Sequence, residues 1–191
     1  AAGADAVMLA PTRALAAELN QRARTERLAA AGPPGRQVTL TDASRASEGD
    51  VIITRRNDRT LRVGGTDYVR NGDRWRIDAV TDDAGLHVTH LASGMRVALP
   101  ADYAARHVQL GYATTVHAAQ GITADTCHTV ATGSETRQLL YVALTRGRHA
   151  NHLYLAVTGD GDPHSIITRD ALLPPTPGAV LTRILARDDS P

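Results

Sequence analysis

The chain has 191 residues, of which 42% are hydrophobic, and its formal charge is +1. This length suits one domain with an insertion or two small domains, and the overall charge does not indicate nucleic acid. All 21 basic residues are arginine. The lysine of a Walker A phosphate loop is therefore absent, and the chain cannot cradle nucleotide phosphates in that way by itself. The single cysteine excludes a disulfide framework, and no apolar run approaches the roughly 20 residues of a membrane span. We therefore expect a cytoplasmic protein.

The first elements predict an α/β unit. Residues 6–10 form a short apolar run typical of a strand buried on both faces, and Thr12 after it is a suitable helix N-cap. A polar helix rich in arginine is expected to continue to about Ala31, where a Gly-Pro-Pro-Gly segment ends it. The abrupt start at a strand indicates a piece of a longer protein. Val51–Thr54 is expected to form a second apolar strand.

The character of the sequence changes over residues 59–107. Short β segments are expected at 75–80, 86–91 and 96–99, with turn signals such as Asn71-Gly72 and Ser93-Gly94 around them. This spacing predicts a small antiparallel β barrel, with Trp75 in its core. Between Arg55 and Arg76 there are seven arginines and three acidic residues, so this stretch is locally basic.

The α/β pattern resumes at residues 109–114. Buried strands are expected at 127–132 and 152–157, with a helix between them from Glu135 to about Arg146 that Ser134 caps. This helix is apolar on nearly all sides and should be buried. A last short helix is expected near 179–186. The predicted organisation is an α/β domain over 1–58 and 108–160, a β insertion over 59–107, and a tail over 161–191.

Two segments carry candidate chemistry. Arg146 ends the buried stripe of its helix and needs a carboxylate or a phosphate as partner, although a helix C-terminus by itself also favours an arginine. Thr115, His117 and Gln120 follow a buried strand, and α/β sheets bind ligands at the carboxyl ends of their strands. Thr115 and His117 would point the same way in an extended segment. Taken alone, each of these residues is more often structural than functional.

Together the two segments closely resemble a known family. GYATTVHAAQGIT (residues 111–123) followed by LYVALTRGR (140–148) resembles motifs V and VI of superfamily 1 helicases. VMLAPTRALAAELN resembles the start of their second RecA-like domain, and GDVIITRRND resembles the beginning of the SH3-like insertion of RecD-like helicases. The resemblance covers residues 5–158. The forms RRND and QGITAD, without the glutamate that many relatives carry after QG, are most similar to the helicase part of MobF-class conjugative relaxases.

The resemblance implies a RecA-like parallel sheet with an inserted SH3-like barrel, and it implies roles for individual residues. Arg146 would be the arginine finger that reaches the γ-phosphate, a contact worth about 10³–10⁵ in rate elsewhere. Gln120 and Gly121 would lie near the nucleotide, and the missing glutamate puts one nucleotide contact in doubt. Single-stranded DNA would contact residues of two segments: Thr115, His117, Arg55, Arg56 and Asn57.

The implied cofactors, ATP and Mg²⁺, would be bound mainly by the first RecA-like domain, which lies outside this sequence. The implied partners are single-stranded DNA and the N-terminal helicase and relaxase domains of the same polypeptide. We therefore expect the isolated chain neither to hydrolyse ATP nor to unwind duplex DNA. His87, His90 and His107 lack partners at metal-ligand spacing, so no metal site is expected.

Two other functions stay open at this point. One is a non-catalytic DNA-binding or scaffold module derived from a helicase, against which the intact TRGR segment argues. The other is a RecD-like recombination helicase, which would lack an upstream nicking domain. Walker motifs upstream in the parent gene would favour the motor.

Overall fold

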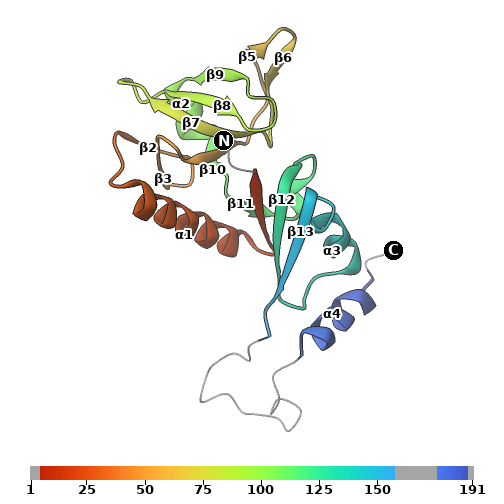
Figure 1. The fold of residues 1–191 in the computed structure, drawn as a ribbon. Helices are drawn as coiled ribbons and strands as arrows, with labels where there is room; N and C mark the ends of the chain where they lie inside the picture. Colours follow the sequence, from red (N-terminus) through yellow and green to blue (C-terminus); the bar gives the residue numbers. More distant parts are fainter. Residues whose placement is uncertain (1–4, 158–175, 189–191) are drawn as a thin grey trace.

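The computed structural model describes residues 5–157 and 176–188, and it contains a parallel and an antiparallel sheet (Figure 1). The parallel sheet has four strands in the order β11 (Ala113–Thr115), β1 (Ala6–Ala10), β12 (Ala124–Ala131) and β13 (Gly147–Leu155). The predicted α/β class with a parallel sheet is thus confirmed.

Helices lie on both faces of the parallel sheet. Helix α1 (Arg13–Ala31) contacts β1 and β11, and the Thr12 side chain caps it by accepting a hydrogen bond from the backbone N–H of Leu15, as predicted. The 3₁₀ helix η1 (His117–Ala119) and helix α3 (Arg137–Ala143) cover the opposite face over a core that includes Val7, Leu9, Cys127 and Ala143. Helix α4 (Pro177–Ala186) packs on α3 and β13 through Val180 and Ile184.

The antiparallel sheet has five strands in the order β10 (Val108–Leu110), β4 (Val51–Thr54), β7 (Arg74–Val80), β8 (Leu86–His90) and β9 (Arg96–Leu99). Beside it lie helix α2 (Ala101–His107) and two hairpins, β2–β3 (Gln37–Thr39, Arg45–Ser47) and β5–β6 (Asp58–Gly64, Asp67–Val69). Trp75 is fully buried in this core, as predicted. Strands β4 and β10 pair here with each other, although the sequence analysis assigned both segments to the α/β unit.

The segment from Thr132 to Leu155 differs from its prediction. Helix α3 is shorter than expected and is capped by Thr136 rather than Ser134, because the Glu135 carboxylate accepts hydrogen bonds from the backbone of Thr132 and Gly133 and so belongs to the preceding turn. The side chain of Tyr141 is 71% exposed, so the helix is not buried on all sides. Strand β13 starts earlier than expected, lies at one edge of the sheet and has no buried residue.

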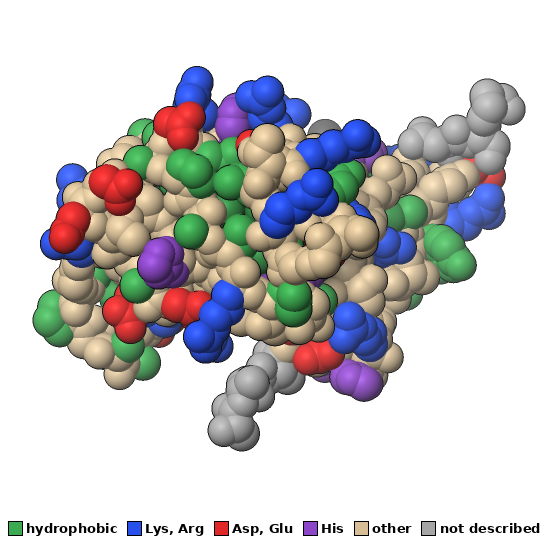
Figure 2. Space-filling view, turned by 90° about the horizontal axis from the view of Figure 1, so that it is seen from above, with side chains coloured by type: hydrophobic (Ala, Val, Ile, Leu, Met, Phe, Trp, Pro, Cys, Tyr) green, Lys and Arg blue, Asp and Glu red, His purple; other side chains and the backbone are tan. Residues whose placement is uncertain are grey.

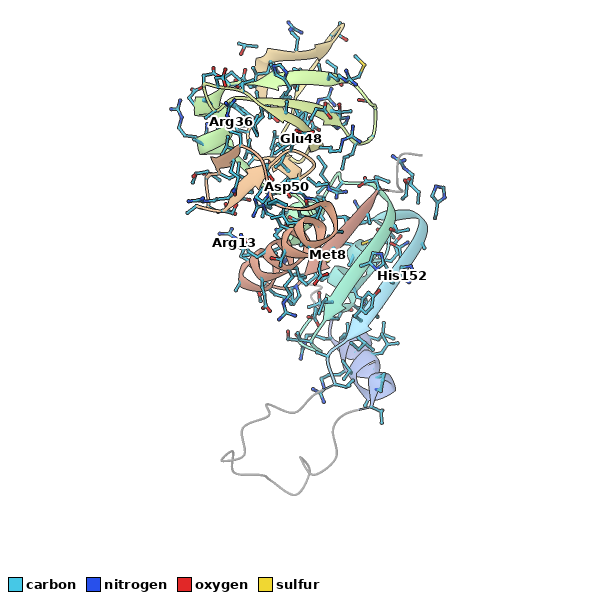
Figure 3. The ribbon with its side chains drawn as sticks, turned by 60° about the vertical axis from the view of Figure 1, so that its left-hand side comes forward. Met8, Arg13, Arg36, Glu48, Asp50 and His152 are labelled. Atoms are coloured by element: carbon cyan, nitrogen blue, oxygen red, sulfur yellow. The ribbon has the colours of Figure 1, made fainter. Side chains whose placement is uncertain are left out.

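Two buried polar clusters join the two sheets, and we call them the seam. In the first, the Arg74 guanidinium is 5% exposed, pairs with Asp5 at 2.7 Å and donates to the carbonyl oxygens of Ala6 and Gly111. In the second, the fully buried Asp50 carboxylate lies between α1 and the antiparallel sheet (Figure 3). The contacts of Asp50 fix α1 against the antiparallel unit; it accepts hydrogen bonds from Arg24, Arg27, Ser47 and Tyr112.

The charge of Asp50 is stabilised by these donors. Burial alone would raise its pKa, but the hydrogen bonds from Tyr112, Ser47 and Arg27 outweigh burial and lower the pKa below its ordinary value. Burial together with the Asp50 carboxylate raises the pKa of Tyr112 to about 12. Asp50 is therefore an ionised carboxylate with a complete set of partners.

Candidate nucleic-acid interface

A cleft of about 580 Å³ lies where the start of α1, the end of β11 and the antiparallel unit meet. It lies beside the carboxyl ends of β1 and β11, where α/β sheets bind ligands. Its walls come from α1, from both units and from the loops between them: Arg13, Ala16, Ala17, Asn20, Asp42, Arg55, Asn71, Gln109, Leu110, Ala113, Thr114, Thr115 and Ala118.

One stripe of α1 forms a wall of this cleft. Arg13, Ala16, Ala17 and Asn20 follow the spacing of one helix face, and the two alanines leave space open in front of them. The Asn20 amide donates to the carbonyl oxygen of Ala113 at 2.9 Å and accepts from its N–H at 2.8 Å. Because β11 is an edge strand, Asn20 satisfies its free backbone groups and fixes the strand against α1.

Arg55 lies opposite this stripe and has only neutral partners. Its Nε donates to Gln109 Oε1 at 2.7 Å and its Nη2 donates to Thr114 Oγ1 at 3.2 Å. Burial lowers the pKa of Arg55, and the nearby charge of Arg13 lowers it further, while Asp42 acts against both. Neither Arg13 nor Arg55 forms an ion pair with any residue of the described part of the chain. Two guanidinium groups thus face the cleft without a paired carboxylate, and a phosphate would suit them.

Of the other predicted DNA-contact residues, Thr115 lines the cleft, whereas His117, Arg56 and Asn57 do not. The Thr115 hydroxyl oxygen accepts from the N–H of Ala118 at 3.3 Å. His117 is exposed and begins η1, so it does not share an extended face with Thr115 as expected; the chain turns here because Val116 and Ala119 are buried in the core. Arg56 contacts the His107 ring at 3.1 Å.

Asn57 does not line the cleft but reaches one of its walls. Its side-chain oxygen accepts a hydrogen bond at 2.8 Å from the N–H of Asn71, which is a lining residue. The sequence analysis missed Arg13, Asn20, Gln109 and Asn71. Arg13 could have been found, because it directly follows the N-cap at the carboxyl end of β1. Gln109 and Asn71 approach only through the packing of the antiparallel unit.

Arg146 lies at the other end of the parallel strands. Its carbonyl oxygen accepts from the N–H of Ala124 at 3.0 Å, where β12 begins. Its guanidinium donates to the Val142 carbonyl oxygen and to Thr145 Oγ1, both at 3.0 Å, and forms no ion pair within the described residues. Gln120 and Gly121 are exposed just before the same strand start. The cleft and the Arg146 region are thus separate surfaces.

The described residues show neither a group of metal-ligating side chains nor a helix that could span a membrane. No cluster of three or more His, Cys, Asp or Glu side chains is placed to hold a metal ion in this part of the chain. None of the helices in residues 5–157 and 176–188 is both long and apolar enough to cross a bilayer.

A model of the Rv2311 SH3-like barrel domain matches residues 38–109, which include nearly all of the antiparallel sheet. The uncharacterized protein Rv2311 of Mycobacterium tuberculosis is 39% identical over 133 residues, which are 68% of this chain and 72% of Rv2311. The chain belongs to the Rv2311 family. Since one alignment covers similar shares of both, this chain and Rv2311 have similar lengths. The conjugal transfer protein TraA of Agrobacterium fabrum is 35% identical over 118 residues, 61% of this chain but 10% of TraA.

Solved structures of DNA helicases contain a part with the same fold as this chain. The Pif1 helicase from Bacteroides in complex with ADP-AlF3 and ssDNA matches with a TM-score of 0.57 at 15% identity, over 91% of this chain and 43% of Pif1. A structure of two coordinating Pif1 helicases at forked dsDNA matches with a TM-score of 0.51 at 18% identity, over 89% of this chain and 41% of the helicase. The chain thus shares the fold of a part of these Pif1 helicases and spans less than half of either of them.

Proposed function

We propose that this chain is a helicase-derived domain that binds single-stranded DNA in the cleft, as the second RecA-like half of an ATP-dependent DNA helicase. The observation that carries the proposal is the pair Arg13 and Arg55, which face one cleft without a carboxylate partner among the described residues. Similarity to TraA supports a conjugative relaxase–helicase as the parent protein.

The cleft offers phosphate-binding groups from three directions. Arg13 is the first residue of α1, where the helix dipole also favours an anion. Arg55 is oriented by Gln109 and Thr114, and Thr115 adds a hydroxyl. These groups bind the sugar–phosphate backbone rather than base edges, so binding would be independent of base sequence and sensitive to salt.

ATP and Mg²⁺ would be held mainly by a first RecA-like domain, because this chain has no lysine for a Walker A loop. Arg146 fits the nucleotide as a single phosphate-binding group, since no carboxylate of the described chain pairs with it. On this proposal Arg146 stabilises the charge of the transferred phosphoryl group, and Gln120 and Gly121 lie beside it. Bound ATP supplies the free energy for translocation.

Fluorescence polarisation with labelled oligo-dT at two salt concentrations tests the DNA site. The protein is expected to bind, and Arg13→Gln and Arg55→Gln are each expected to weaken binding and to lower the slope of log K against log salt by about 0.7. Arg22→Gln, an exposed α1 arginine paired with Glu18 away from the cleft, is the matched control. Equal effects of the cleft and control variants would contradict the proposal.

A second candidate is a scaffold or DNA-binding module without a motor function. It is favoured by the size of Rv2311, since 133 residues make up 72% of that protein, which leaves little room there for two RecA-like domains and an insertion. Arg146→Gln separates the two functions. In the motor it abolishes ATP hydrolysis by the complete enzyme and leaves DNA binding intact, whereas in a scaffold it changes neither.

A further inference from the structure

The β5–β6 hairpin has one apolar and one basic face. Leu61, Val63 and Val69 pack on the core of the antiparallel unit. Arg62 and Tyr68 are a cross-strand pair, Arg62 is exposed and Tyr68 is half-buried. We call residues 58–70 the Tyr68 hairpin. The apolar contacts of its inner face hold the hairpin on the antiparallel unit, and its outer face remains available to bind a ligand.

Two arginines lie near the ring of Tyr68, and a third is its cross-strand neighbour. The guanidinium carbons of Arg59 and Arg70 lie 5.8 and 5.2 Å from the ring centroid, and Arg62 is the cross-strand neighbour. Cation–π contacts of this kind hold a guanidinium near the ring without neutralising it. Tyr68 therefore orders flexible arginine side chains that would otherwise lose much conformational entropy on binding an anion.

Most of this charge is not paired within the described chain. Arg70 forms an ion pair with Asp67 at 2.7 Å, but Arg59 and Arg62 form none with any described residue. The nearby Asp58 carboxylate instead accepts from the backbone N–H and hydroxyl of Thr60. Figure 2 looks down on this end of the molecule and shows several basic side chains at its surface, with acidic ones among them.

The base of the Tyr68 hairpin adjoins the cleft. Asn57, directly before β5, accepts a hydrogen bond from the N–H of Asn71, directly after Arg70, and Asn71 lines the cleft. The cleft arginines and the hairpin arginines are therefore linked through this one bridge. A strand that leaves the cleft past Asn71 would next meet the basic face of the hairpin.

We propose that the Tyr68 hairpin is a second binding site for the phosphate backbone of single-stranded DNA, with Arg59 and Arg62 contacting phosphates and Tyr68 positioning the Arg59 guanidinium. The proposal rests on the proposed function, because the strand reaches the hairpin from the cleft. It does not require base stacking on Tyr68, since guanidinium groups already lie near that ring.

Oligo-dT of two lengths, about 6 and about 16 nucleotides, tests the proposal within the range of single-strand site sizes. Arg59→Gln/Arg62→Gln is expected to leave the short oligonucleotide's Kd within about twofold and to lower the long oligonucleotide's salt slope by about 1.4. Arg55→Gln is expected to weaken both. If Arg55→Gln has no effect on binding while the hairpin variant weakens it, the proposed DNA site in the cleft is contradicted, and the phosphate site on the hairpin is supported separately.

Three results would overturn the hairpin proposal. The double variant could weaken binding of the long oligonucleotide no more than Arg22→Gln/Arg183→Gln, a control that removes the same charge from α1 and α4. It could weaken both lengths equally, or it could weaken only substrates with a duplex segment. Tyr68→Phe and Tyr68→Leu test positioning: Phe should preserve long-oligonucleotide binding and Leu should reduce it, with equal thermal stability for both. Loss of binding in both variants, or in neither, would remove Tyr68 from the site.

Discussion

Arginines in two neighbouring regions of this protein have opposite environments. In the seam, Arg74 pairs with Asp5 and donates to two carbonyl oxygens, while Arg24 and Arg27 share the buried Asp50. In the cleft, Arg55 binds only an amide and a hydroxyl oxygen. Each arginine of the first group contacts a carboxylate, and Arg55 contacts none among the described residues.

This difference separates structure from binding. A buried guanidinium paired with a carboxylate holds two elements together, and its charge is already compensated. A guanidinium oriented by neutral groups keeps its charge available and is already positioned. Changes in the seam should therefore act on stability, and changes in the cleft should act on binding.

The largest effect is expected for Asp50→Asn. It leaves Arg24 and Arg27 without a buried counter-charge, and breaking such a pair costs about 3–5 kcal/mol in free energy of unfolding. Urea denaturation at pH 7 measures the loss. Asp82→Asn removes the partner of Arg36 at an exposed site and is the matched control, with an expected change below about 0.5 kcal/mol.

The Asp50 effect should also depend on pH. The folded-state pKa of Asp50 is lowered, so its stabilisation is fully present above the unfolded-state pKa of about 3.9 and is lost as pH falls through the lower folded value. The difference between wild type and Asp50→Asn is therefore expected to be constant from neutral pH to about 5 and to shrink below about 4. A difference that grows on acidification would be inconsistent with an ionised Asp50.

An intermediate effect is expected for Gly111→Ala, which tests how closely the chain at the end of β10 approaches β4. A Cβ at Gly111 would lie 2.6 Å from the carbonyl carbon and 2.7 Å from the carbonyl oxygen of Ile52, and this backbone cannot move aside easily. Overpacking of this kind costs about 1–3 kcal/mol. At Gly35 an added Cβ meets nothing within 4 Å, so Gly35→Ala should leave the denaturation midpoint unchanged or slightly raised.

The smallest stability effect is expected for Arg55→Gln. The variant loses hydrogen bonds to two neutral partners but leaves no buried carboxylate unpaired, so its cost lies below that of Asp50→Asn. Its denaturation midpoint should lie much nearer wild type than that of Asp50→Asn, while its DNA affinity falls. If Arg55→Gln were as unstable as Asp50→Asn, Arg55 would have a structural role like that of the seam arginines.

Local patterns predicted several elements correctly. The apolar run at residues 6–10, the Thr12 cap and the turn-separated strands of the β insertion depend on neighbours in sequence, and all three are present. The sequence patterns predicted helix and strand bounds less well where a side chain bonds to the neighbouring backbone or where buried residues turn the chain. Glu135 bonds to the preceding turn and shortens α3, and Val116 and Ala119 turn the chain at His117.

The sequence by itself determined the α/β class, the SH3-like insertion, the lack of a Walker lysine and the segments carrying Thr115, Arg55 and Arg146. Only the tertiary structure decided that Arg13, Arg55 and Asn71 line one cleft. It also decided that Arg74 and Arg24 form ion pairs with carboxylates. Partners such as Arg74 and Asp5 are distant in the chain, and their pairing depends on how the two sheets pack. An arginine in this sequence is therefore a structural ion-pair partner at one position and a binding group without a carboxylate partner at another.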